Sequence, residues 1–429
     1  MNQAASSSTH ALGAEAVTVM EHVDGERLIA MQRKLASFGL LANGGVAREA
    51  LTTVELDARR WLCSAFDGPQ YRWSIDDAAN LFLRRAGTDD DAAPVMTGSH
   101  IDTQPVGGWL DGAYGVIAGL EVMRALDDAG IRTRRPLEVA IWTNEEGSRF
   151  NPGAMGSSAF ATPHRLGAFL DVCDAAGTSF RAARDAARAA TPAAQPTHLG
   201  RSVHAYIEAH IEQGPVLEDG GQVLGIVTGI QGVRWFEVEV RGCSAHAGTT
   251  PLSARKDALM RAAQLVSAIG TLAETQQDPA LRLTVGRFDV ARGSINTIAD
   301  QVVFTIDLRH PDDTTLDRLE TAIHDLIDAN DARCSTEMRS LMRRAPTVFD
   351  TRILDVLDAA VVATGEPFRR LGSGAFHDAM FLADICPTAM LFVPSRQGIS
   401  HHPAEDTAEA ELIAGARALA GALTALATR

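Results

Sequence analysis

The chain has 429 residues, a formal net charge of −15 and five scattered cysteines. That length suits more than one domain, and 46% hydrophobic with 22% charged residues is the composition of a globular protein. The acidic balance argues against a nucleic-acid partner, because phosphate binding needs a basic face. The cysteines form no CxxC pair, which argues against a disulfide framework or a thiolate zinc site and favours the cytoplasm.

The first residues are small and polar, without the basic and apolar segments of a signal peptide. Residues 1–20 are therefore expected to form a disordered tail. Because no stretch approaches 18 consecutive apolar residues, we expect no membrane span.

Strand and helix patterns alternate along the first half of the chain. Two amphipathic helices are predicted at 23–38 and 51–66, then a buried strand at 94–96, a helix at 116–126 and a strand at 137–142. This alternation predicts an α/β domain with a mainly parallel sheet covered by helices. Chemistry then belongs in the loops at the strand ends.

From Gly232 the pattern changes to strand-helix-strand-strand-helix-strand. That order is the split βαβ, ferredoxin-like unit. Residues 231–342 are therefore predicted to be an inserted domain. Residues 21–230 and 343–429 are predicted to form the domain around it.

One short loop, GSHIDTQPVGGWLDGAYG, contains His100, Asp102 and Asp111. Imidazole and carboxylate together are the donors that a divalent metal such as zinc prefers. Two metals that share one carboxylate form a hydrolytic site. The alternative is a turn whose carboxylates cap backbone groups.

Three further segments offer ligands. Glu145 and Glu146 follow an apolar strand, so one could ligate a metal while the other holds the proton of a water. His210 is a candidate ligand, although a lone histidine is often structural. His401 and His402 are adjacent, and only one is expected to bind.

The predicted insertion has its own polar residues. His246 follows a strand and could hold an oxyanion, and Asn296 and Arg309 lie in or beside the next strand pair. Arginine presents a planar fork that suits a carboxylate. The alternative is a structural ion pair of Arg309 with Asp307 or Asp312.

Taken together, these segments resemble the hydantoinase/carbamoylase branch of the aminoacylase and carboxypeptidase metallo-amidohydrolases. That branch includes N-carbamoyl-L-amino-acid hydrolases, allantoate amidohydrolases and β-ureidopropionases. The matching motifs run in the family's order from Gly98 to Glu405, and eight in order are highly specific: GSHIDTQPVGGWLDGAYGV, TNEEGSRF, HIEQGPVLE, GCSAHAGTTP, GSINTIAD, DLRHP, HDA and GISHHPAE.

The resemblance implies a role for each candidate residue. One metal would be held by His100, Asp111 and His210, and the other by Asp111, Glu146 and His401, with Asp111 as the bridge. Glu145 would be the general base and then the acid, Asp102 would orient His100, and His246 would polarise the scissile carbonyl. Asn296 and Arg309 would hold the substrate carboxylate, with Gln213 nearby.

The resemblance also implies two divalent ions per subunit, Zn²⁺ first and Mn²⁺, Co²⁺ or Ni²⁺ as alternatives. It implies a homodimer that pairs through the insertion, which would also serve as a lid. The expected activity is hydrolysis of N-carbamoyl-L-amino acids. The alternatives are allantoate or β-ureido acid hydrolysis, N-acyl amino acid or dipeptide hydrolysis, and a binding protein without activity.

One segment departs from the family pattern. The family often reads Gly-Ala-Gly-His-Asp-Ala, whereas this chain has Phe376 at the third position, before His377. That bulk is expected to shift substrate preference if the loop lines the pocket.

Overall fold

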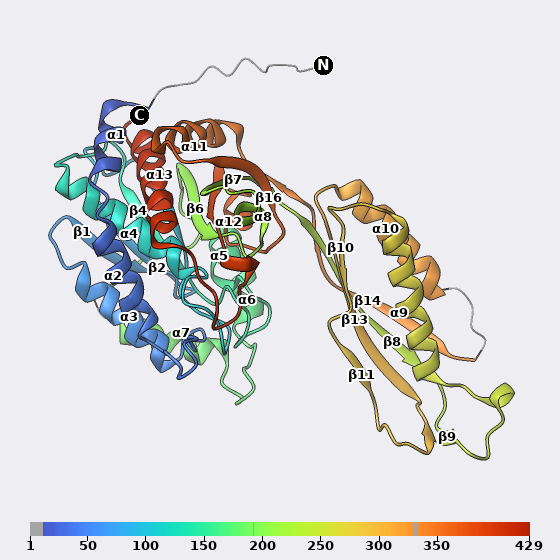
Figure 1. The fold of residues 1–429 in the computed structure, drawn as a ribbon. Helices are drawn as coiled ribbons and strands as arrows, with labels where there is room; N and C mark the ends of the chain where they lie inside the picture. The colour runs from blue at the N-terminus through green and yellow to red at the C-terminus, as the bar shows by residue number, and fades with distance from the viewer. Residues whose placement is uncertain (1–11, 192, 329–332) are drawn as a thin grey trace, which may run out of the picture. The chain divides into compact units, whose positions relative to one another are not determined.

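The computed structural model describes residues 12–191, 193–328 and 333–429. The chain divides into two compact units, described separately below (Figure 1). Unit 1 comprises the described residues up to Thr228 together with Val348–Arg429, and unit 2 comprises the described residues of Gly229–Thr347. The predicted insertion, residues 231–342, falls inside unit 2. The backbone N–H of Phe349 donates to the carbonyl of Thr228 over 3.1 Å, so the chain leaves and re-enters unit 1 at one place.

Unit 1 is built on a ten-stranded sheet in the order β15-β7-β17-β6-β3-β4-β2-β1-β5, with β16 paired to β7. The strands are β1 Tyr71–Ile75, β2 Leu81–Arg85, β3 Val95–His100, β4 Leu137–Trp142, β5 Gln195–Pro196, β6 Ala205–Ile211, β7 Leu224–Ile230, β15 Thr347–Val348, β16 Phe368–Ser373 and β17 Thr388–Val393. The sheet is mixed. Strands β17, β6, β3 and β4 are parallel, whereas β2 and β7 pair antiparallel with β4 and β17.

The sheet is therefore less parallel than expected. At the β1–β2 side of the sheet, the connection between the two strands, residues 76–80, is short. A connection of this length permits only an antiparallel pair. The four central strands are nevertheless buried at every residue. Strands buried on both faces require cover on both faces.

Helices provide that cover. They are α1 Ala14–Glu21, α2 Gly25–Ala36, α3 Thr53–Ala65, α4 Ala113–Asp128, α5 Met155–Ala161, α6 Leu166–Phe169, α7 Phe180–Ala190, α8 Val216–Asp219, α11 Thr351–Thr364, α12 Ala379–Leu382 and α13 Glu409–Ala427, with short 3₁₀ turns at Pro163–Arg165 and Arg396–Gly398. Helices α4 and α13 pack on β3 and β6, and α12 packs on β6 and β17.

The structure contradicts the predicted disordered tail, residues 1–20, over part of its length. Residues 1–11 lie outside the described residues, but residues 14–21 form α1. This helix buries Ala16, Val19 and Met20 and packs against α13. The prediction missed α1 because so short a helix gives only a weak periodic signal in the sequence. Its partner, α13, also lies almost 400 positions away in the chain.

Helix α13 is, by length and hydropathy alone, able to cross a membrane, with a mean hydropathy of 1.4 over its apolar window. In the structure 78% of that window is buried, against α1, α4 and α11. This is the environment of a core helix.

Unit 2 is an antiparallel sheet with helices on one face. Its elements are β8 Gly232–Arg241, β9 Ala245–His246, a 3₁₀ turn Leu252–Ala254, α9 Ala258–Thr275, β10 Arg282–Thr284, β11 Phe288–Val290, β12 Thr297–Ile298, β13 Gln301–His310, α10 Asp313–Asp328 and β14 Ser335–Arg344. The main sheet has the order β10-β13-β8-β14, with β11 also on β13. Buried residues alternate along β13, and its inward side chains form one core with α9 and α10. A half-covered antiparallel sheet shows this alternation.

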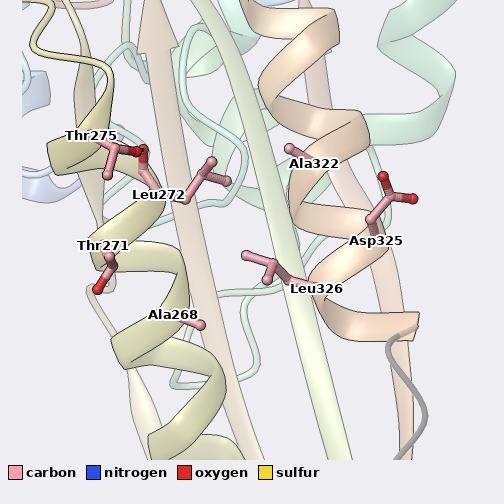
Figure 2. A pocket seen from close by; sticks show the side chains of 7 residues that line it. All are labelled: Ala268, Thr271, Leu272, Thr275, Ala322, Asp325 and Leu326. Carbon is pink, nitrogen blue, oxygen red and sulfur yellow. Dashed lines mark hydrogen bonds between the residues drawn. The ribbon is translucent and has the colours of Figure 1, made fainter.

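A hollow of about 570 Å³ lies between α9 and α10 (Figure 2). Its lining is mostly methyl groups, and no predicted site residue belongs to it: Ala268, Thr271, Leu272, Thr275, Ala322, Asp325 and Leu326.

Candidate functional site

The candidate ligands lie at one edge of the central sheet. Strand β3 ends on His100, and β6 carries His210 one residue before its end. Glu145 and Glu146 follow β4, and His401 lies in the loop after β17. Because these four strands are parallel, their carboxyl ends meet at the same edge. The fold therefore brings together segments that are up to 300 residues apart in the sequence.

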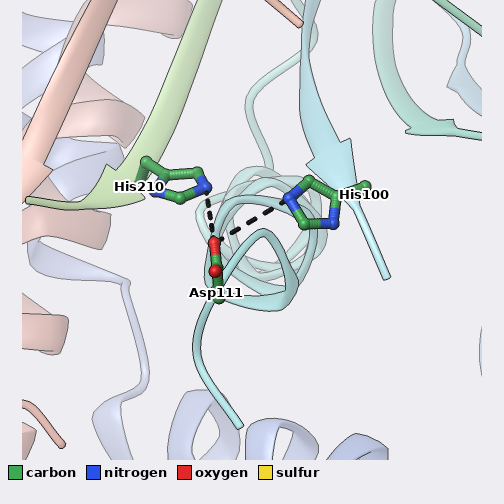
Figure 3. A group of neighbouring side chains, drawn as sticks. All are labelled: His100, Asp111 and His210. Atoms are coloured by element: carbon green, nitrogen blue, oxygen red, sulfur yellow. Dashed lines mark ion pairs between the residues drawn. The ribbon is translucent and has the colours of Figure 1, made fainter. Parts of the chain in front are cut away.

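Asp111 lies between two groups of donors. Its Oδ1 is 3.9 Å from Nε2 of His100 and 3.2 Å from Nε2 of His210, and Figure 3 shows the carboxylate between these two rings. Its Oδ2 is 3.1 Å from Nε2 of His401, which is also 3.4 Å from Oε2 of Glu146. In each triad the donor atoms lie within 4.8 Å of one another, and Asp111 belongs to both.

Backbone carbonyls orient two of the imidazoles. Nδ1 of His100 lies 2.9 Å from the carbonyl oxygen of Asp102, and Nδ1 of His210 lies 2.9 Å from that of Ile211. Each Nδ1 is thereby assigned the proton, since a carbonyl oxygen only accepts. When the imidazole is neutral, the lone pair is therefore on Nε2, which is the atom that faces Asp111. A neutral imidazole in this orientation is ready to ligate a metal.

Gly112 makes room for this arrangement. Its φ is +63°, a value that L side chains rarely adopt, and a Cβ there would overlap the ring of His100. The glycine therefore allows the start of α4 to pass directly beneath the imidazole.

Three of the site loops contain a non-glycine residue in the left-handed region. These are Asn144, with φ of +56°, Gln213, with φ of +58°, and His401, with φ of +54°. Such residues are uncommon and cost about 1–3 kcal/mol each. Because all three lie in loops of the site, contacts with neighbouring residues must hold the backbone conformation at this edge of the sheet.

Asp102 acts on both neighbouring segments. Its carbonyl holds His100, as described, and its two carboxylate oxygens accept from the backbone N–H groups of Glu145 and Glu146 at 3.3 and 3.2 Å. The carboxylate itself is 3.9 Å from Nδ1 of His100. The predicted carboxylate–histidine contact is thus longer than the carbonyl contact, and the carboxylate mainly anchors the glutamate loop.

Negative charge accumulates in this buried region. Burial, together with the charges of Asp378 and Glu146, raises the pKa of Glu145 well above its usual value. Burial and the charge of Asp111 raise the pKa of Glu146 to about 8. Burial also raises the pKa of Asp102 to about 6. Repulsion of this kind is what a bound cation removes, so the charge distribution fits a metal centre.

Asp111 and its histidines show the complementary effect. Although burial opposes ionisation, hydrogen bonds to His210 and His401 hold the pKa of Asp111 well below its usual value. Burial opposes protonation of His210, but the contact with Asp111 favours it, and the pKa of His210 is raised to about 9. The Asp111 contact likewise raises the pKa of His401 to about 9. Burial instead lowers the pKa of His100 to about 4. The raised pKa values of His210 and His401 therefore favour a positive charge beside Asp111, where a cation could take its place.

Glu208 is a functional candidate that the sequence analysis missed. It is fully buried on β6 and accepts from Oγ of Ser99 at 2.7 Å and from N of Ala379 at 2.8 Å. Together with His210 and His377 it forms a third metal-like group, but His377 contacts Ser373 through its Nε2. These atoms are already satisfied, which favours a supporting role. The sequence feature that could have identified it is the spacing of Glu208 and His210, which lie two positions apart and so share one face of a mostly apolar strand.

Three other supporting residues were also missed as site residues. Gln104 donates to both oxygens of Glu146, from N at 3.1 Å and from Nε2 at 2.7 Å. Ser400 and Glu405 contact Asp111 and its backbone. Gln213, predicted to lie near the substrate carboxylate, donates from Nε2 to Oδ2 of Asp111 at 3.0 Å.

The other predicted residues belong to unit 2. His246 on β9 pairs with Thr297 on β12, so the structure brings His246 and the neighbouring Asn296 together. Both are exposed. Nδ1 of His246 accepts from N of Gly248 at 3.1 Å, which assigns its proton to Nε2.

Arg309 makes the ion pair that was the alternative reading of its sequence. Its Nε and Nη2 donate to the two carboxylate oxygens of Asp307 at 3.0 and 2.8 Å. Both residues lie on the helix-free face of the sheet, since they alternate with the buried positions of β13. The guanidinium fork is therefore already engaged with a carboxylate in this structure.

Comparison with known proteins gives consistent matches. Residues 96–425 match peptidase family M20/M25/M40. An N-carbamoyl-L-amino-acid amidohydrolase of Rhizobium meliloti is 36% identical over 401 residues, which cover 92% of this chain and 95% of that protein. An allantoate amidohydrolase of Bacillus subtilis (strain 168) is 33% identical over 397 residues, which cover 92% of this chain and 95% of that protein.

A solved structure has a similar fold over almost the whole chain. It is an amidase of the hydantoinase/carbamoylase family from Burkholderia multivorans, with 40% identity and a TM-score of 0.85. The match covers 95% of this chain and 98% of that one.

Proposed function

Because this chain belongs to the hydantoinase/carbamoylase amidases of peptidase family M20/M25/M40, we propose that it hydrolyses the carbamoyl C–N bond of N-carbamoyl-L-amino acids. The products are the amino acid, carbon dioxide and ammonia. The observation that carries the proposal is the position of Asp111, shared by two triads of donors.

The two triads are the proposed metal sites. His100, Asp111 and His210 would hold one divalent cation, and Asp111, Glu146 and His401 would hold the other. Mixed nitrogen and oxygen donors suit Zn²⁺ first, with Mn²⁺, Co²⁺ or Ni²⁺ as alternatives. Cations bound there supply Lewis-acid polarisation of the carbonyl and a water whose pKa is brought down to about 7.

Glu145 carries the proton in this mechanism. Its Oε2 lies 3.5 Å from Nε2 of His100, and its surroundings favour the protonated form once a proton arrives. Glu145 takes a proton from the attacking water and gives it to the amino-acid nitrogen as the C–N bond breaks. The carbamic acid released then separates into carbon dioxide and ammonia.

Residues of unit 2 are assigned to the substrate. His246 carries its proton on Nε2 and can donate it to the carbonyl oxygen as negative charge develops. Asn296 and Arg309 bind the substrate carboxylate. For Arg309 this requires that the substrate share or replace Asp307. Gln213 of unit 1 was also predicted to take part, but its Nε2 already donates to Asp111 and to Ser400.

Two further properties complete the proposal. Unit 2 mediates a homodimer, and the enzyme acts in the cytoplasm without nucleic-acid or membrane partners. Sedimentation of the purified protein at micromolar concentration tests the dimer, and a monomer at that concentration contradicts it.

An ammonia-release screen tests the activity. The protein is stripped of metal, reconstituted separately with Zn²⁺, Mn²⁺, Co²⁺ and Ni²⁺, and offered N-carbamoyl-α-amino acids, N-carbamoyl-β-alanine, allantoate and N-acetyl amino acids. We expect the highest kcat/KM on N-carbamoyl-L-amino acids. The B. subtilis relative makes allantoate the second candidate. Turnover of acetylated amino acids alone overturns the proposal, as does fewer than one bound cation per chain after reconstitution.

A further inference from the structure

A closed ring of hydrogen bonds joins the side chain of Asp111 to its own backbone. Nε2 of Gln213 donates to Oδ2 of Asp111 at 3.0 Å and to Oγ of Ser400 at 3.1 Å. Ser400 donates in turn to Oε2 of Glu405 at 2.9 Å. Oε1 of Glu405 accepts from N of Leu110 at 2.9 Å and from N of Asp111 at 3.0 Å. The ring returns to the residue from which it started.

Glu405 is built into this position. It is 2% exposed, and its backbone carbonyl accepts from Nε1 of Trp109 at 3.1 Å. A Cβ at Gly108 would overlap its carboxyl group. The chain from Gly108 to Asp111 thus wraps around Glu405, and buried N–H groups there have no water to replace the carboxylate.

The same short loop carries His401. This residue has φ of +54°, so its backbone conformation is held by neighbouring contacts rather than by its own preference. Half of its side chain is exposed, and packing alone therefore does little to fix it. The ring through Ser400 and Glu405 connects the loop of His401 to the backbone of Asp111.

The geometry points to Glu405 as a positioning residue for the shared carboxylate. With Ser400 it fixes the rotation of the Asp111 side chain and ties the His401 loop to it, so that both triads keep their spacing when a cation binds or leaves. Glu405 does not touch the reacting atoms. The inference rests on the proposed metal centre, and residues that orient ligands in this way are worth about 10- to 100-fold in metal affinity.

Three variants test it with Zn²⁺ alone as the probe, in competition with a chromophoric chelator. Glu405→Ala removes the acceptor of two backbone N–H groups. Glu405→Gln keeps an acceptor for both and can donate to Ser400, so the ring can still close. Glu121→Ala is the matched control, because Glu121 is fully buried and accepts from N of Asp24 at 2.8 Å without contacting the site.

We expect Glu405→Ala to weaken Zn²⁺ binding by about 10- to 100-fold, Glu405→Gln to restore most of it, and Glu121→Ala to lower the melting temperature with unchanged Zn²⁺ affinity. If Glu405→Ala fails to fold, Ser400→Ala decides, with an expected loss of about 2- to 10-fold. Wild-type affinity in the folded Glu405→Ala variant overturns the inference, as does wild-type affinity in Ser400→Ala when Glu405→Ala does not fold. Wild-type protein that binds two Zn²⁺ ions without hydrolysing carbamoyl substrates overturns the proposed function alone.

Discussion

The two units present their polar side chains in different ways. In unit 1, His100, Asp111 and His210 are at most 4% exposed, and each is oriented by a backbone or side-chain partner. In unit 2, His246 and Asn296 are exposed, and Arg309 is paired with Asp307 on an open face. Buried donors keep a fixed spacing, which suits the cation proposed for this triad, whereas His401 of the second triad is half exposed. Exposed groups can exchange one partner for another, which suits contact with a substrate that comes and goes.

The largest effect is expected from removing the shared carboxylate. Asp111→Ala deletes a donor from both triads, so we expect loss of both cations and a fall in activity of more than about 100-fold, beyond what supporting residues contribute. His401→Ala removes one cation, and His402→Ala, the adjacent and exposed histidine, removes none. Plasma emission spectroscopy on gel-filtered protein gives the metal content. Two cations retained by Asp111→Ala would show that the triads are not the sites.

Next in size is the proton carrier. Glu145→Gln keeps the shape of the side chain but cannot carry a proton, and kcat is expected to fall about 100- to 10,000-fold. Metal content stays at the wild-type value, which separates this change from the loss of a ligand. Unreduced turnover in a variant with both cations would remove Glu145 from the mechanism.

A smaller and different effect is expected in unit 2. Arg309→Ala removes charge-assisted hydrogen bonds, each worth about 1.5–3 kcal/mol, so KM should rise about 10- to 100-fold with kcat little changed. Arg287→Ala is the matched control, since Arg287 also pairs with a carboxylate of the same sheet, that of Glu237. An unchanged KM in Arg309→Ala would place the substrate carboxylate elsewhere and leave Arg309 with a structural role in its ion pair with Asp307.

The smallest expected effect is the release of protons when a cation binds. The pKa of both His210 and His401 is raised to about 9 in the metal-free protein, so both hold protons at pH 7. A cation must displace these protons, and its affinity therefore increases with pH until about pH 9. Calorimetric titration with Zn²⁺ in buffers of different ionisation enthalpy measures the protons released. An observed enthalpy that is the same in every buffer contradicts the expectation.

Much of the site could be predicted because the rule that places it is general. Ligands that follow buried parallel strands meet at one sheet edge, so the positions of His100 and Glu146 after apolar segments predict that they lie close together. His210 and His401 were assigned to the same site by the family resemblance. The family resemblance is confirmed by the match over residues 96–425. Helix α1 depends on a partner helix that is distant in the sequence, and the antiparallel pairing of β1 and β2 depends on a short turn. The periodicity of the sequence reveals neither of these features.

Pairing between side chains was less predictable than their convergence. The Arg309–Asp307 contact was one of two readings, and residue types alone could not choose between them. Glu405 lay within a recognised motif, yet its role depends on the backbone of Leu110 and Asp111, almost 300 residues earlier. Every residue except proline has a backbone N–H, so residue types do not show which N–H groups bind Glu405. Such contacts are found only in the three-dimensional structure.

The hydrogen bond between Phe349 and Thr228 holds the two ends of the insertion side by side. Since the polypeptide departs and returns at neighbouring points, deletion of residues 229–347 leaves ends that a tight turn can bridge. A gene joined in this way encodes the ten-stranded sheet almost entire, with every proposed cation ligand. All the proposed cation ligands therefore lie in the part of the chain outside the insertion.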